Sequence, residues 1–240
     1  MRRDHRPYCI KKFHLKFQEL YARYFVKPQF DYLGDGFTFL NPWNIEIFGS
    51  PIEIGRHANI ITTSDHKVRL TVWAKQKDKG KIKVGDYCLI CPGVRISSAE
   101  EITISDNCMI ASGAYITDTD WHDIYNRVHS LGNPGAVHIG ENAWIGDSAI
   151  ICKGVHIGEN SIVGAGSVVI HSIPPNVIAA GNPAKIVKQL DPEIPFVKRA
   201  EWFADPAMLA NDIDQLDKDN LKGNTFSHWL RTLVFPKNSD

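Results

Sequence analysis

The sequence lacks any bias of charge. Its 240 residues contain 27 Lys and Arg against 27 Asp and Glu, so the formal net charge is zero. This balance argues against the basic footprint of a nucleic-acid-binding protein. No apolar run approaches the roughly 18 residues that a membrane-spanning helix needs, and no apolar segment near the N-terminus resembles a signal peptide. We therefore expect a cytoplasmic protein without a nucleic-acid partner.

Cysteine is also sparse, with five residues in an odd and scattered set. Such a set favours reduced thiols over a disulfide framework. Cys88 and Cys91 do form a C-x-x-C motif, but a single pair without a second is weak support for a metal site. We expect no bound metal.

What the sequence has in abundance is a six-residue repeat of aliphatic residues. The repeat occupies the following positions: Val84, Ile90, Ile96, Ile104, Ile110, Ile116, Ile139, Ile145, Ile151, Ile157, Val163 and Val169. A period of six fits neither a helix nor a long strand. It fits short strands joined by tight corners, with three sides to a coil. Successive coils would stack about 4.8 Å apart as parallel strands.

The coils can be aligned as three sides, A, B and C, which start at Val84, Ile90 and Ile96. The next two coils then start late, at Ile104 and Ile139, and both delays fall at the corner between sides C and A. Residues 117–137 are therefore predicted to form a loop extruded from one edge of a continuous prism.

Side B is predicted to have an apolar outer face. Because side chains alternate along a strand, the residue before each inward aliphatic points outward. On side B these outward residues are Leu89, Met109, Trp144 and Ile162. A solvated face would not carry such a row. We expect another subunit to cover side B, with a terminal helix as the alternative cover.

The flanks of the repeat have helical patterns. The helical spacing of Phe13, Phe17, Leu20, Tyr21 and Tyr24 predicts an amphipathic helix over residues 9–26. Residues 1–28 hold eight Lys or Arg against two acids, so this helix could lie on a membrane surface, although packing on its own domain is the favoured interpretation.

Two helices are expected after the repeat. Asp205 and Pro206 predict the start of the first, and Gly223 its end. Residues 224–235 predict the second. The expected domains are an N-terminal helix, a β-helix domain and a C-terminal helical extension, at residues 1–30, 31–190 and 191–240.

The run IGENAWIGDSAIICKGVHIGENSIVGAGSVVIHSIPPNVIAAGNPAKIV, residues 139–187, resembles the C-terminal coils of the left-handed β-helix acyltransferases. It is most similar to the maltose and galactoside O-acetyltransferases and their polysaccharide-modifying relatives. The resemblance covers residues 82–190. It implies an all-β parallel, left-handed β-helix that uses acetyl-CoA as co-substrate and forms a homotrimer through side B.

His122, in the extruded loop, is the candidate general base. Acetyl transfer needs a group that accepts a proton at neutral pH, and an imidazole with an unperturbed pKa of about 6.5 suits this task. The similar sugar acetyltransferases carry their catalytic histidine in this loop, and His122 is the residue that matches. Asp118, Asp120 and Asp123 lie within reach to orient it, and we take Asp120 as the catalytic partner. His129 is the fallback base.

The resemblance also implies the donor site. Lys185 and Lys188 match basic positions that meet the charged end of coenzyme A, for which a lysine suits a phosphate. The other implied donor-binding residues lie at coil corners and at the turn that leaves the last coil: Gly146, Asp147, Gly164, Ala165, Asn182 and Pro183.

The acceptor site departs from the family pattern. Cys91 and Ala99 occupy the positions of the Asn and Asp that grip a free sugar, so we do not expect a simple disaccharide. Trp121, Tyr125 and Arg127 could bind the acceptor instead, because aromatic rings stack on sugars and arginine suits a carboxylate or phosphate. A packed loop with a surface arginine is the alternative.

The favoured function is acetyl-CoA-dependent O-acetylation of a sugar in polysaccharide or lipopolysaccharide biosynthesis. N-acetylation of a nucleotide-linked amino sugar and acetylation of a xenobiotic are the alternatives within the class. A non-catalytic scaffold or a zinc protein like the γ-carbonic anhydrases is the alternative outside it. His138 and His156, 18 residues apart, would stack on side A, but the accompanying zinc pattern of that family is missing.

Overall fold

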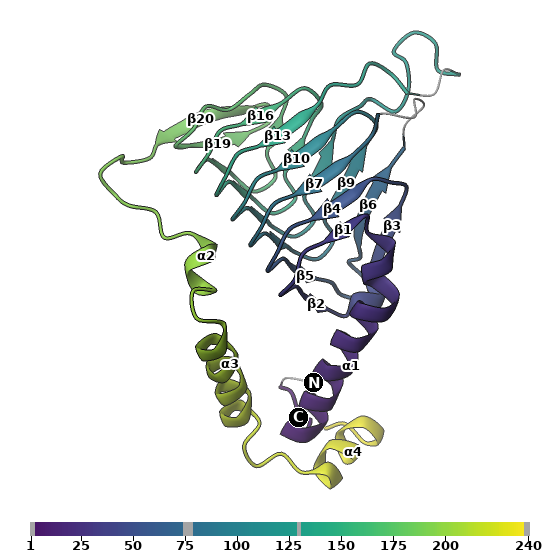
Figure 1. Ribbon diagram of the computed structural model, residues 1–240, viewed down its shortest axis with the longest axis vertical. Coiled ribbons are helices and arrows are strands. Elements are labelled where there is room, and N and C mark those ends of the chain that lie inside the picture. The colour runs from purple at the N-terminus through teal and green to yellow at the C-terminus, as the bar shows by residue number, and fades with distance from the viewer. Residues whose placement is uncertain (1–2, 74–78, 129–130, 238–240) are drawn as a thin grey trace.

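The computed structural model describes residues 3–73, 79–128 and 131–237. Its body is a triangular prism of three sheets, through which the chain winds coil after coil (Figure 1). Sheet A consists of β1 (Tyr32–Leu33), β4 (Ile52–Ile54), β7 (Ile82–Val84), β10 (Ile102–Ile104), β13 (Val137–Ile139) and β16 (His156–Ile157). Sheet B consists of β2 (Thr38–Leu40), β5 (Asn59–Ile61), β8 (Leu89–Ile90), β11 (Met109–Ile110), β14 (Trp144–Ile145), β17 (Ile162–Val163), β19 (Val177–Gly181) and β20 (Ala184–Gln189). Sheet C consists of β3 (Ile45–Phe48), β6 (Val68–Val72), β9 (Arg95–Ser98), β12 (Tyr115–Thr117), β15 (Ile150–Ile151) and β18 (Val168–Val169).

The predicted β-helix is confirmed, and sides A, B and C are sheets A, B and C. Neighbouring strands pair in parallel, apart from the antiparallel hairpin of β19 and β20. The outward row of side B has the predicted register, in which Leu89 pairs with Met109, Met109 with Trp144, and Trp144 with Ile162. Between Thr117 and Val137 the chain leaves the prism, at the corner between sheets C and A (Figure 1).

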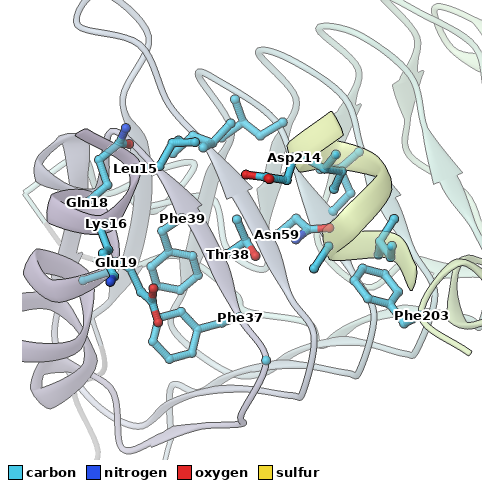
Figure 2. Close-up of a pocket in the computed structure, with 18 of the residues that line it drawn as sticks. Leu15, Lys16, Gln18, Glu19, Phe37, Thr38, Phe39, Asn59, Phe203 and Asp214 are labelled. Atoms are coloured by element: carbon cyan, nitrogen blue, oxygen red, sulfur yellow. The ribbon is translucent and has the colours of Figure 1, made fainter. Parts of the chain in front are cut away.

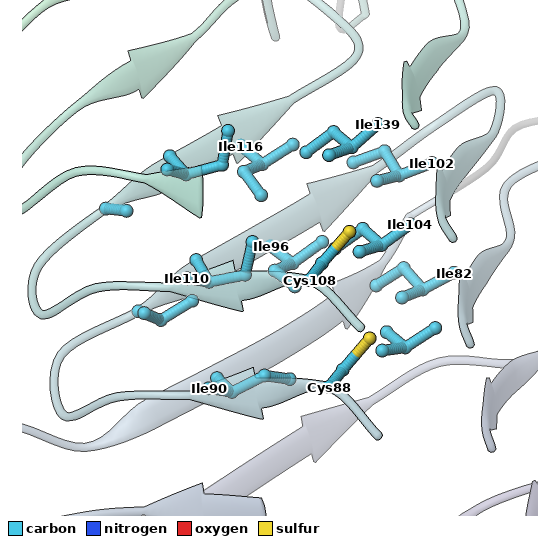
Figure 3. Packing of buried hydrophobic residues seen from close by; sticks show 14 of the residues in the cluster. Ile82, Cys88, Ile90, Ile96, Ile102, Ile104, Cys108, Ile110, Ile116 and Ile139 are labelled. Atoms are coloured by element: carbon cyan, nitrogen blue, oxygen red, sulfur yellow. The ribbon is translucent and has the colours of Figure 1, made fainter. Parts of the chain in front are cut away.

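The core is a stack of inward side chains that come from the short strands and from the corners between them (Figure 3). The repeat isoleucines, such as Ile90 and Ile110, are fully buried, and each burial contributes about 2 kcal/mol. Cys88 and Cys108 lie one above the other inside this stack. A hydrogen bond with Cys108, together with burial, raises the pKa of the Cys88 thiol. Cys88 is therefore a neutral core residue, so packing accounts for the first cysteine of the C-x-x-C motif.

The corner between sheets A and B contains a ladder of asparagines in left-handed backbone conformation. Asn142, Asn160 and Asn176 have φ angles of 58°, 58° and 59°, which asparagine tolerates better than most residues. Their side-chain amides join successive coils, since Asn142 donates to Asn160 and Asn160 to Asn176, each at 2.9 Å. The ladder fixes the coil register at this edge.

Helices flank the prism, as predicted for both ends of the chain. They are α1 (Tyr8–Tyr21), which runs on through the π turn η1 (Ala22–Val26) and the 3₁₀ turn η2 (Lys27–Gln29), a 3₁₀ turn η3 (Pro42–Asn44), α2 (Arg199–Trp202), α3 (Pro206–Asn220) and α4 (Phe226–Val234). The predicted cap is present, because the Asp205 side chain accepts the Met208 N–H. In the described ranges, no helix has both the length and the apolar composition needed to cross a bilayer.

The C-terminal segment returns to the N-terminal helix. Lys11 of α1 forms an ion pair with Asp217 of α3, and Tyr8 donates a hydrogen bond to Asp214. The short helix α2, which the sequence did not predict, is held by Arg199, whose guanidinium donates to Asn59 at 2.6 Å and to the Tyr87 carbonyl at 2.7 Å.

Candidate active site

The neck of the extruded loop is built on Asp118. Its buried carboxylate accepts hydrogen bonds from the Ser98 hydroxyl at 2.7 Å and from the backbone N–H groups of Ala99 and Glu100 at 2.7 and 2.9 Å. Its carbonyl accepts the Gly135 N–H at 2.8 Å, which closes the loop on itself. Asp118 therefore joins the loop to the preceding coil, and its carboxylate is committed to this structural task.

A tight turn at Trp121 presents His122. Trp121 has a φ of 61°, and the His122 N–H donates to the Asp120 carbonyl at 2.8 Å. A three-residue turn with positive φ is a rare and strained γ-turn, and such strain persists only where the surroundings fix it. The His122 side chain is exposed. The turn thus carries the candidate base at the surface of a constrained backbone.

The partners of Asp120 explain how this turn is held. The Asp120 carboxylate forms an ion pair with Lys153, which lies at the same corner in the next coil. Lys153 also donates to the Asn133 carbonyl at 2.8 Å, on the returning arm of the loop. The sequence analysis did not predict a role for Lys153. The coil register could have revealed it, because it places residue 153 at the corner from which the loop leaves the prism.

The Trp121 ring is tied to the outer face of sheet C. Its indole N–H is shared between the Tyr115 hydroxyl and the Thr117 hydroxyl, each at 3.1 Å. The Arg95 guanidinium stacks over the Tyr115 ring, 4.3 Å from its centroid. The indole N–H therefore serves the loop, and only the ring face is left for a ligand.

The tip of the loop projects from the prism (Figure 1). Tyr125 is 96% exposed, and the Arg127 Nε donates to the Ile124 carbonyl at 3.0 Å. Asp123 caps the tip by accepting the N–H groups of Tyr125 and Asn126, each at 2.8 Å. The fallback base, at position 129, lies outside the described residues.

The predicted donor residues gather along the corner between sheets B and C. Gly146 follows β14, Gly164 follows β17, and Asn182 and Pro183 form the turn after β19. A Cβ on Gly146 would lie 2.5 Å from the Val163 carbonyl oxygen of the next coil, which no side chain tolerates.

Coil stacking also favours glycine at position 164, where a Cβ would lie 2.9 Å from the Ala180 Cβ. Gly166 differs, because its φ of 66° favours glycine while the space beside it is open. Of the small residues at this corner, Gly166 is the one that leaves room for a ligand. The Asp147 carboxylate accepts a hydrogen bond from the Ser148 hydroxyl at 2.7 Å. Ala165 occupies the equivalent position of the next coil.

A β-bulge brings the two predicted phosphate-binding lysines to one face. Lys185 pairs with Ala180 and Lys188 with Ile178, and the register shifts between these pairs. Without the shift, a spacing of three would point the lysines to opposite faces. Because Ile178 continues the outward row of sheet B above Ile162, both exposed lysines lie at the end of that row.

The two halves of the predicted site lie on different edges of one chain. His122, Asp120 and Lys153 are at the corner between sheets C and A, whereas Gly166 and the donor turn follow sheet B. Within a single chain, the candidate base and the predicted donor residues thus lie on opposite sides of sheet C.

An apolar groove of about 950 Å³ covers the first coils of sheet B (Figure 2). Helix α1 forms one wall, α2 and α3 the other, and β2 and β5 the floor. Of the four predicted contact residues of side B, Leu89 is the one that lines this groove. Terminal helices therefore border the lower part of side B, and Trp144, higher up, is 44% exposed in the single chain.

The histidines and thiols do not form a metal site in the described part of the chain, where no three metal-ligating side chains converge. His138 and His156 lie one above the other on sheet A, as predicted, with ring centroids 6.2 Å apart and ring planes tilted by 46°. Burial, followed by the charge of Asp120, raises the pKa of the Cys152 thiol. A thiol held neutral in this way is a poor nucleophile.

The prism and its extruded loop define a left-handed β-helix protein built from hexapeptide repeats. Residues 136–171 match the family model of the bacterial transferase hexapeptide (six repeats), so the predicted resemblance to this transferase family is confirmed. The AntD N-acyltransferase of Bacillus cereus, solved with dTDP and coenzyme A, has the same fold, with a TM-score of 0.53 and 19% identity over 83% of this chain and 96% of that one.

Two relatives extend the comparison. WbbJ of Escherichia coli (strain K12), provisionally named as a lipopolysaccharide biosynthesis O-acetyl transferase, is 35% identical over 50% of this chain and 63% of its own. YJL218W of Saccharomyces cerevisiae, provisionally named as an acetyltransferase, is 40% identical over 45% of this chain and 56% of its own. The chain thus spans less than two thirds of the length of these relatives.

Proposed function

We propose that the chain is an acetyl-CoA-dependent acetyltransferase that acts on a sugar hydroxyl in polysaccharide or lipopolysaccharide biosynthesis. The observation that carries the proposal is the anchored loop, which holds an exposed imidazole on a constrained turn at a prism edge. The names of both relatives support acetyl transfer, and that of WbbJ, a lipopolysaccharide biosynthesis O-acetyl transferase, supports the proposed pathway.

The chemistry is direct transfer with His122 as the general base. Its imidazole takes the proton of the acceptor hydroxyl while the hydroxyl oxygen bonds to the thioester carbonyl carbon. Backbone N–H groups at a coil corner stabilise the tetrahedral oxyanion. Its collapse breaks the C–S bond, and the imidazolium returns the proton to the departing thiolate. Asp120, paired with Lys153, acts by fixing the turn that carries His122.

The separation of the two half-sites supports a homotrimer with the donor groove between subunits. The loop of one subunit would meet the donor edge of its neighbour, where Lys185 and Lys188 bind the charged end of coenzyme A. Side B, with its exposed Trp144, is the proposed contact face. Tyr125 and Arg127 at the loop tip, with the Trp121 ring face, are proposed to bind the acceptor.

The test is a screen of sugar and nucleotide-sugar acceptors for free-thiol release from acetyl-CoA. We expect one acceptor class to give turnover, and His122→Ala to lower kcat by about 10²–10⁴-fold. His138→Ala, at another exposed histidine, is the matched control and should keep full turnover. Unchanged turnover in His122→Ala would remove His122 from the mechanism.

A further inference from the structure

Helix α1 and the turn after it pack on the prism by their less apolar face. Gln18, Ala22 and Val26 are buried against the first coils, and the Gln18 side-chain oxygen accepts the backbone N–H of Asn41. The predicted packing of this helix on its own domain is therefore present. Of the residues whose spacing predicts this helix, Tyr21 joins this packing as a partly buried side chain, and the other four do not.

The aromatic face of α1 lies on the outside instead. Phe13 is 72%, Phe17 50%, Leu20 63% and Tyr24 76% exposed. These four residues, which we call the α1 stripe, are spaced so that they follow one side of the helix. Trp43 extends the surface, with its ring 6.4 Å from that of Phe17. A water-exposed helix face with this much aromatic area marks an interaction surface.

The charge beside the stripe is positive. Between residues 8 and 29 the chain has five Lys or Arg and a single acid, Glu19. Lys12, Lys16 and Arg23 are exposed along one flank of the stripe. Arg23 pairs with Glu19 and Lys12 with Asp214, but exposed pairs of this kind are weak in water and yield readily to phosphates.

We propose that the α1 stripe binds the surface of an anionic lipid bilayer, with α1 lying in the headgroup region. A helix with aromatic and leucine side chains on one face and basic residues beside them has the composition of interfacial helices, and lipid phosphates would neutralise Lys12, Lys16 and Arg23. A second copy that docked through the same face would instead bring like charges together. The inference is independent of acetyl transfer.

The experiment measures sedimentation of the full chain with phosphatidylcholine vesicles, with and without phosphatidylglycerol. We expect binding to the anionic vesicles that added salt weakens. The variant Phe13→Ser/Leu20→Ser/Tyr24→Ser should bind at least about tenfold more weakly, because it removes most of the apolar area. Phe48→Ser/Trp73→Ser is the matched control at another exposed aromatic pair, 58% and 55% exposed, and should bind like the wild type.

Three outcomes would overturn the proposal. The first is a wild-type chain that does not sediment with anionic vesicles, and the second is a stripe variant that sediments as well as the wild type. The third is a smaller gel-filtration mass for the stripe variant, which would assign the stripe to a second copy. The charge variant Lys16→Glu/Arg23→Glu, which leaves the apolar side chains in place, should also lose binding and guards against a folding defect in the first variant.

Discussion

Asp118 and Ser98 form a hydrogen bond of 2.7 Å between two fully buried side chains, one at the neck of the loop and the other at the end of β9. The same carboxylate accepts two backbone N–H groups of the preceding coil. The buried Asp118 carboxylate thus attaches the candidate active-site loop to the prism, and it supplies the acceptor for all three donors.

Replacement of Asp118 should therefore destabilise the protein and release the loop. Asp118→Ala leaves three buried donors without an acceptor, which costs about 3 kcal/mol or more. Asp118→Asn keeps one acceptor oxygen and should cost less, and Ser98→Ala about 1 kcal/mol. Urea unfolding measures these values. A loss below about 1 kcal/mol in Asp118→Ala would show that the carboxylate does not hold the loop.

Lys153 should matter for turnover more than for stability. Lys153→Met frees the Asp120 carboxylate and the returning arm of the loop, so the turn at His122 loosens. We expect kcat to fall by about tenfold, because misplacement of a catalytic group is costly, with the KM for acetyl-CoA unchanged. Lys153→Arg should restore most of kcat.

The matched control for this variant is Lys67→Met. Lys67 pairs with Glu46 at the first coils of sheet C, where both side chains are similarly exposed and neither contacts the loop neck. Its removal should leave kcat unchanged. Equal effects of the two lysine variants on kcat would mean that Lys153 acts through general stability alone.

The periodicity predicted the prism because each inward aliphatic is specified locally, by its own corner and strand. This is why the side-B row from Leu89 to Ile162 was placed in the correct register. The partners of Asp118 and Asp120 could not be predicted in the same way, since Ser98 and Lys153 reach them across coils. Nor does a helical stripe reveal which face is buried, so the exposed face of α1 had to come from the structure.

The buried thiol of Cys88 predicts a loss of stability at alkaline pH. The pKa of Cys88 is raised above the ordinary value of 9.0 in the folded chain, so the unfolded chain loses this proton first. Stability is therefore complete below about pH 9 and falls as the pH rises above it, by at most about 1.4 kcal/mol per pH unit for one thiol.

Urea unfolding as a function of pH measures this slope. The variant Cys88→Ala/Cys108→Ala removes the Cys88 thiol together with its hydrogen-bond partner, and alanine already occupies the equivalent position of the next coil, Ala143. It should show a smaller alkaline slope, whatever its stability at neutral pH. An identical slope in the variant and the wild type would assign the alkaline loss to other groups.

The placement of the base and the donor residues on different edges predicts complementation between subunits. His122→Ala removes the base but leaves the donor edge intact, whereas Lys185→Glu/Lys188→Glu damages only the donor edge. In a cyclic trimer, each interface uses the loop of one subunit and the donor edge of the next. Refolding the two inactive variants together at equal amounts gives random trimers, in which about one interface in four has both halves intact. We expect about a quarter of wild-type turnover from the mixture and almost none from either variant alone. If both half-sites belonged to one subunit, mixing would restore nothing, and turnover would stay at the level of the separate variants.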